Sequence, residues 1–206
     1  MFLKKYLLWI LLFGTLIGLN ESLIGSFNTP YRSVVLSAIS LLLLSIARIK
    51  VQKAGTSILI ILIAVLFKVN NMGFHNCTSH ALLCGPTALL MLGITYEVFA
   101  GIFAAKNKIS YLQLLLICSL SSIATFSLFA VMNTFILRAW DMDRLYEYIL
   151  VKSTLSAFFS GSLGLLAVYL SGNIPFKGFS MNAKVINGIL STLILMLWLC
   201  GSLVKF

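Results

Sequence analysis

The sequence contains few charged residues, and it is especially poor in acids. Of its 206 residues, 10% are charged, and 5 of these are Asp or Glu. Hydrophobic residues make up 60% of the chain, and the mean hydropathy is +1.05. A water-soluble fold of this size has too little interior to bury so much apolar surface. The composition therefore excludes a soluble protein and indicates an integral membrane protein that lies in a lipid bilayer.

Long polar segments and phosphate-binding motifs are also missing. The hydrophobic runs are joined by short polar connections such as "RAWDMDR" at 138–144. No glycine-rich phosphate loop occurs, so we expect no built-in nucleotide-driven motor. Any ATP would have to be hydrolysed by a partner. No internal repeat is evident either, and the sequence does not support the inverted-repeat architecture of many secondary transporters.

Hydrophobic runs fill most of the chain. A membrane-spanning helix needs roughly 20 mainly apolar residues, because its backbone polar groups must be satisfied within the segment. The sequence predicts an all-α, polytopic integral membrane helical bundle of six to seven transmembrane helices, with residues 1–206 as a single domain. The third run is short and ends in Lys68, whose side chain could snorkel to the interface, so it decides the number of spans and the side of the C-terminus. The runs are approximately 6–23, 31–49, 55–69, 81–105, 111–137, 146–170 and 185–204.

The distribution of Lys and Arg predicts the orientation. Short cytoplasmic loops collect these residues, and the first run, although it resembles a signal sequence, lacks a small-x-small cleavage site, so we interpret it as a retained helix. We therefore expect a multi-pass protein of the cell membrane with a cytoplasmic N-terminus. The net charge of +10 is then mostly a topology signal, and nucleic-acid binding is not needed to explain it. The cations predicted to lie inside are Lys4, Lys5, Arg48, Lys50, Lys53, Lys106, Lys108, Lys177 and Lys184.

Two charged residues, Glu97 and Lys152, are predicted to lie within the membrane. Glu97 lies past the middle of the run 81–105, where a carboxylate is costly. A role in substrate binding, ion binding or gating is one explanation, and a structural hydrogen bond is the other. Lys152 lies near the opposite, outer side of the membrane, about 15 Å away in depth at about 1.5 Å of rise per residue. We therefore expect no Glu97–Lys152 ion pair, and we predict that Lys152 reaches the outer interface or the mouth of a cavity.

Small residues are spaced for close helix contacts in two runs. Gly14 and Gly18 form a small-xxx-small pair in the first, while Ala157, Gly161 and Gly164 line part of the sixth. Such positions let another helix approach closely. They indicate either packing within this bundle or docking to a separate membrane subunit.

Histidine and cysteine residues gather before and at the start of the fourth predicted helix. The set His75, Cys77, His80 and Cys84 offers four donors of the kind that zinc, nickel, cobalt or copper accept, although the spacing matches no recognised zinc signature. The helix is predicted to begin near Ser79, which places His80 and Cys84 on one face. A bound transition metal, a Cys77–Cys84 disulfide, a polar pocket wall and an ordinary helix entry all remain open, and no other cofactor is indicated.

Part of the sequence resembles a family of transport proteins. The run "GLNESLIGSFNTPYRSVVLSAISLLLLSIARIKVQKAGTSILIILIAVLFKV", followed by "GPTALLMLGITYEVF", is similar to the substrate-specificity subunits (S components) of energy-coupling factor transporters and their uncharacterised relatives. The similarity lies in a short basic turn with Gly-Thr-Ser that opens the third helix, and in Gly85 and Pro86 leading into a helix that carries Glu97. It covers roughly the first half of the chain.

The resemblance implies a function in uptake, in which this chain captures a substrate and carries out no catalysis. S components are small bundles, usually of six helices, that capture a vitamin or metal ion from outside and work with a coupling transmembrane subunit and paired ATPase subunits. Small residues on their first helix dock the coupling subunit, a role that would fall to Gly14 and Gly18. The predicted seventh helix departs from this pattern.

The polar residues on the predicted outer half agree with such a function, because a cavity lined by them would suit a small polar solute held between helices. The predicted substrate-binding residues are Asn71, His75, His80, Glu97 and Asn133. Two other classes of function remain open. One is a membrane thiol redox protein that uses Cys77 and Cys84, and the other is a structural or assembly subunit without a ligand.

Overall fold

A computed structural model describes residues 2–25, 29–72, 79–103, 110–173 and 183–203. All regular structure in these ranges is helical, which confirms the all-α prediction. Ten helical segments are described: α1 (Phe2–Gly25), α2 (Arg32–Val51), α3 (Thr56–Met72), α4 (Ser79–Phe103), α5 (Tyr111–Val131), η1 (Met132–Ile136), α6 (Met142–Tyr146), η2 (Glu147–Lys152), α7 (Ser153–Asn173) and α8 (Ala183–Leu203).

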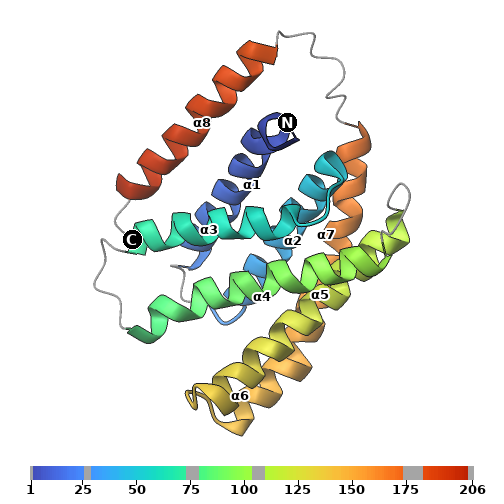
Figure 1. Cartoon of the computed structure of the whole chain (residues 1–206). Coiled ribbons are helices and arrows are strands. Elements are labelled where there is room, and N and C mark those ends of the chain that lie inside the picture. Colours follow the sequence, from blue (N-terminus) through green and yellow to red (C-terminus); the bar gives the residue numbers. More distant parts are fainter. Residues whose placement is uncertain (1, 26–28, 73–78, 104–109, 174–182, 204–206) are drawn as a thin grey trace.

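Six helices form a closed ring. Each packs against its two neighbours in the order α1, α3, α4, α5, α7, α2 and back to α1. The side chains inside are large and apolar, and they include Ile17, Leu41, Ile61 and Tyr96, all at most 1% exposed. The eighth helix, α8, lies outside this ring against α1 and α3, at one edge of the molecule (Figure 1). Its indole nitrogen, Trp198 Nε1, donates a hydrogen bond to Thr15 Oγ1 at 3.0 Å.

Long and short helices take part in the same ring. Within the described ranges, five helical stretches are long and apolar enough to cross a membrane: Tyr6–Ile24, Arg32–Val51, Gly85–Phe103, Tyr111–Ile136 and Met142–Ser171. The apolar parts of α3 and α8 that are described, Thr56–Asn70 and Leu190–Leu199, are shorter. The chain is therefore a helical bundle suited to a membrane, while the number of spans stays a prediction.

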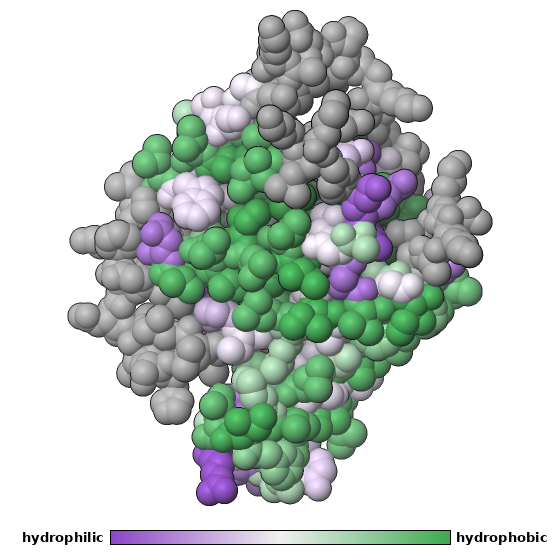
Figure 2. All heavy atoms as spheres, viewed as in Figure 1, coloured by the Kyte–Doolittle hydropathy of each residue, from purple (hydrophilic) through white to green (hydrophobic). Residues whose placement is uncertain are grey.

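Apolar side chains also cover the outside of the bundle. Leu66, Ile94, Ile102 and Phe158 are each more than half exposed, and hydrophobic atoms dominate the face in Figure 2. In water this surface would be unfavourable, whereas hydrocarbon chains solvate it well. The exposed apolar surface and the length of the helices thus both indicate a lipid bilayer as the environment of the bundle.

The α5–α7 hairpin extends beyond the other helices, with α6 at its tip (Figure 1). Two π-helical segments, η1 and η2, widen the helices near this tip. Serine hydroxyls join the hairpin to α2: Ser156 Oγ lies 2.7 Å from Ser37 Oγ and 2.6 Å from Ser122 Oγ. A Cβ on Gly161 would lie 2.5 Å from Ser119 Oγ, so this glycine serves packing between α5 and α7.

Candidate functional site

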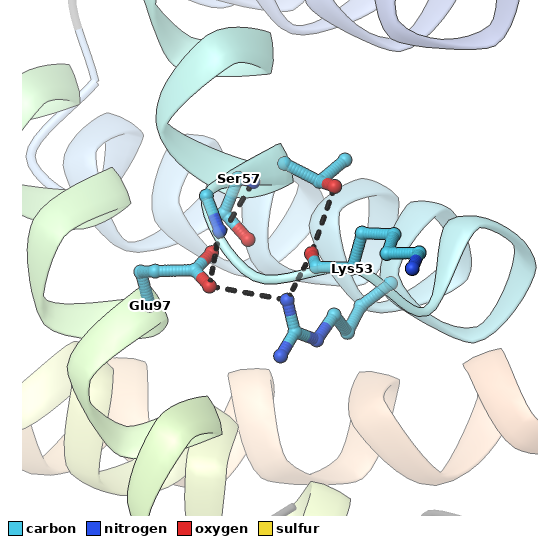
Figure 3. A network of polar contacts seen from close by, with 6 residues as sticks. Lys53, Ser57 and Glu97 are labelled. Carbon is cyan, nitrogen blue, oxygen red and sulfur yellow. Dashed lines mark hydrogen bonds and ion pairs between the residues drawn. The ribbon is translucent and has the colours of Figure 1, made fainter. Parts of the chain in front are cut away.

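The Arg48 end of α2 contains a buried ion pair. Arg48 Nη1 lies 3.1 Å from Glu97 Oε1, and the two side chains are 10% and 14% exposed. The same carboxylate accepts hydrogen bonds from two backbone amides at the start of α3, Gly55 N at 2.8 Å and Ser57 N at 3.3 Å. Figure 3 shows Glu97 pointing from α4 towards this turn. We call Arg48, Glu97 and the turn at 53–57 the turn network.

Backbone geometry explains why the turn needs an outside acceptor. Gln52 adopts a left-handed conformation (φ 49°) that ends α2, and Gly55 has a φ of +79° that a side chain would disfavour. The first amides of a helix have no partner within it, and the helix dipole favours a negative charge there. Glu97 supplies both the acceptor and the charge from another helix. Arg48 also donates to Lys53 O, which accepts a further bond from Thr56 Oγ1 at 2.8 Å.

A second buried ion pair lies near the Arg32 end of the bundle. Lys68 Nζ, on α3, is paired with Glu21 Oε1 on α1, and the two side chains are 9% and 13% exposed. The ammonium of Lys68 thus pairs with an acid of a neighbouring helix, a contact that the sequence analysis did not foresee, and the snorkelling of Lys68 to the interface stays a prediction. Gly85 on α4 leaves space for this pair, since a Cβ there would collide with Lys68 Nζ.

A hollow opens at the Arg32 end, between the start of α2 and η2. Its volume is about 370 Å³, and it is lined by Thr29, Pro30, Arg32, Ser33, Tyr148 and Lys152. We call these six residues the Arg32–Lys152 hollow. Lys152 Nζ is held 3.1 Å from Glu147 Oε1 and 4.1 Å from the centre of the Tyr148 ring. Lys152 lies at a cavity, as predicted, and it forms its ion pair with Glu147 rather than with Glu97.

Besides Glu97, three of the predicted site residues have defined roles in packing or hydrogen bonding. Asn133, 1% exposed, donates from its side-chain Nδ2 to Phe129 O at 2.8 Å, and its backbone carbonyl oxygen accepts from Ala139 N at 2.9 Å. Gly14 and Gly18 are buried against α3: a Cβ on them would lie 2.6 Å from Ile63 Cβ and 2.8 Å from Phe67 Cβ, respectively. This position corresponds to the alternative in which the glycines pack within the bundle.

The proposed metal set falls largely outside the described residues. His75 and Cys77 lie in the undescribed range 73–78, and only the backbone of His80, Cys84 and Asn71 is described. The start of α4 at Ser79 agrees with the sequence prediction. Among the described side chains, no group of three or more His, Cys, Asp or Glu residues could hold a metal. The metal, disulfide and pocket-wall hypotheses for this set therefore stay predictions.

The sequence analysis foresaw neither buried ion pair, Arg48–Glu97 or Lys68–Glu21. It placed Arg48 in a cytoplasmic loop and Glu21 on the outer face, and it paired neither with a residue inside a helix. A signal was present, however, because the Gly-Thr-Ser start of α3 has no carboxylate of its own while Glu97 has no cation in its own helix. The sequence analysis did not identify the Arg32–Lys152 hollow, because Arg32 and Lys152 are 120 positions apart in the chain.

Comparisons with known proteins add no relative. The chain matches no family model, and neither curated proteins nor solved structures show significant similarity to it.

Proposed function

We propose that this chain is the membrane-embedded substrate-binding subunit of an ATP-driven uptake transporter of the energy-coupling factor type. It captures a small solute from the outer face and carries out no catalysis. The coupling transmembrane subunit and the ATPase subunits are its partners. The N-terminus and the turn network lie on the cytoplasmic side in this proposal.

The observation that carries the proposal is the ring of six helices with a polar hollow at one end. A six-helix bundle is what the resemblance to S components implies, and α8, which departs from that pattern, lies outside the ring. The residues that carry the resemblance also have defined positions: Gly55 and Ser57 bind Glu97, and Gly85 makes room for Lys68. The Arg32–Lys152 hollow lies at the opposite end of α2 from the turn network, as a binding site open to the outside requires.

The test is purification of the full chain from its native membrane in a mild detergent, followed by mass spectrometry of bound small molecules and proteins. We expect about one solute per chain, together with a coupling membrane subunit and ATPases. A control purification of an unrelated polytopic membrane protein from the same membrane identifies background components. Recovery of the folded chain with neither solute nor ATPases would overturn the proposal.

A second candidate function, a structural subunit without a ligand, is favoured by one observation. Both buried acids of the described bundle, Glu21 and Glu97, are occupied by partners within the chain. In that case the same purification would yield a different membrane protein in stoichiometric amount and no solute.

A further inference from the structure

We propose that the Arg32–Lys152 hollow binds the anionic group, phosphate or carboxylate, of the molecule that this chain captures. This inference rests on the proposed function and names the chemical class of the ligand. A phospholipid headgroup and a free solute can both supply such a group.

The lining of the hollow is positively charged. Two of the six lining residues, Arg32 and Lys152, are cations, and none of the six is an acid. The acid that contacts Lys152 is Glu147, whose side chain is 51% exposed, whereas that of Lys152 is 12% exposed. The cation is thus sheltered while its partner stays largely in solvent. An anion that enters the hollow meets an ammonium with little competing hydration, which strengthens the attraction.

Three of the other lining residues, Thr29, Ser33 and Tyr148, have side chains with a hydroxyl group. The hollow also borders the first turn of α2, where Arg32 N and Val34 N already donate to Thr29 O and Tyr31 O at 3.3 and 3.0 Å. The helix dipole therefore contributes more than free amides, and at a helix start it favours an anion. Charge-assisted bonds to phosphate or carboxylate oxygens are among the strongest that such groups make.

The side chain of Lys152 is held in place by its neighbours. Its ammonium is positioned by Glu147 at 3.1 Å and by the Tyr148 ring at 4.1 Å. Tyr148 is in turn held by aromatic contacts, with its ring centre 4.4 Å from that of Trp140 and 6.0 Å from that of Phe126. These residues belong to or pack on η2, and π-helical turns occur frequently at functional sites. A long side chain held in place loses less entropy when it binds a ligand.

The size of the hollow limits what it can hold. A volume of about 370 Å³ is at the lower end of the range of roughly 300–1,000 Å³ for small-molecule sites. It accommodates a headgroup or a small acid, with any apolar remainder left outside. On the same segment η2, Leu150 and Val151 are apolar and 64% and 49% exposed.

The experiment uses the full chain in an uncharged detergent and measures saturation binding by native mass spectrometry. One arm adds phosphatidylglycerol, and a second adds glycerol 3-phosphate, so that a lipid source and a free source of phosphate are distinguished; a third adds acetate as a small carboxylate. We expect saturable binding at one site in at least one arm. Lys152→Gln and Arg32→Gln should each weaken it about tenfold, the loss of one charge-assisted contact.

Two further variants keep the result interpretable. Arg144→Gln removes an exposed cation of α6, outside the six lining residues, and should change binding less than twofold. Lys152→Arg keeps the charge and should retain most of the affinity, which separates a binding role from simple loss of fold. Equal losses in all three glutamine variants would indicate nonspecific attraction and overturn the proposal, as would the absence of saturable binding in all three arms. If solute and ATPases co-purify but Lys152→Gln does not change solute content, this inference fails while the proposed function stands.

Discussion

Helix α2 carries an arginine at each end, and the two arginines lie in opposite surroundings. Arg48 is 9% exposed and bonds to Glu97, which also accepts two amides of α3. Arg32 is exposed and lines a hollow that it shares with a second cation. The charge that looks most unusual in the sequence, Glu97, is therefore fully used within the fold. The two cations that line the hollow, Arg32 and Lys152, lie at the other end of α2, where a topology signal would explain them equally well.

The largest expected effect is a difference in labelling between the two ends of the bundle, because they are predicted to lie on opposite sides of the membrane. In a chain whose four cysteines are replaced, Ala54→Cys lies in the turn network region and Asp143→Cys lies in α6. The orientation predicted from Lys and Arg places them on opposite sides. An impermeant thiol reagent added to intact cells should label Cys at 143 nearly completely and at 54 hardly at all, with labelling of lysed cells as the control for reactivity. Equal labelling of the two positions in intact cells would contradict the predicted orientation.

Removal of the Glu97 charge should cost more stability than any other change to a described acid. Glu97→Gln leaves Arg48 buried without its counter-ion and weakens the bonds to Gly55 N and Ser57 N. We expect the free energy of unfolding to fall by about 3 kcal/mol. Titration of the detergent-solubilised chain with a denaturing detergent, followed by circular dichroism, measures this.

Glu147→Gln is the matched control for that prediction. It also removes an acid from an ion pair, but its side chain is 51% exposed, so water reaches the pair, and Lys152 keeps the Tyr148 ring 4.1 Å away. Its loss should therefore cost no more than about 1 kcal/mol. Similar losses for both variants would contradict a special role for the turn network. A fall in solute content for Glu97→Gln without a fall in stability would instead favour the binding role considered for this residue.

Close packing of α1 on α3 should give the next largest effect. A Cβ at position 14 would lie 2.6 Å from Ile63 Cβ and 2.7 Å from Ile60 O, and the backbone atom cannot simply rotate away. We expect Gly14→Ala to lower the free energy of unfolding by about 1–3 kcal/mol. Gly101→Ala is the control, because nothing lies within 4 Å of its Cβ position, and it should be neutral or stabilising by up to about 1 kcal/mol. If Gly14→Ala is silent as well, the glycines do not determine this contact.

The sequence was sufficient for the helices but not for their partners. Each of the seven hydrophobic runs contains a helix, because the need to satisfy backbone groups in hydrocarbon leaves a segment of this composition few alternatives. The pairing of Glu97 with Arg48 depends instead on which helices become neighbours in the ring, and residues 49 positions apart carry no local signal of it. The same holds for Lys68 and Glu21. The hollow is a property of two helix ends together, so no single segment predicts it.

The smallest effect concerns Gly85, next to the second buried pair. A Cβ there meets Lys68 Nζ first and Glu21 Oε1 at 3.0 Å, and the lysine end is flexible enough to move aside. Gly85→Ala should therefore lower the free energy of unfolding by only about 1 kcal/mol, through a weakened ion pair rather than a moved backbone. A double-mutant cycle identifies the cause. In a Lys68→Met background the ammonium is absent, so the same Gly85→Ala change should become neutral or slightly stabilising, because alanine favours the helix more than glycine does. An equal cost in both backgrounds would show that Gly85 serves the path of the α4 backbone rather than the space that the Lys68–Glu21 pair needs.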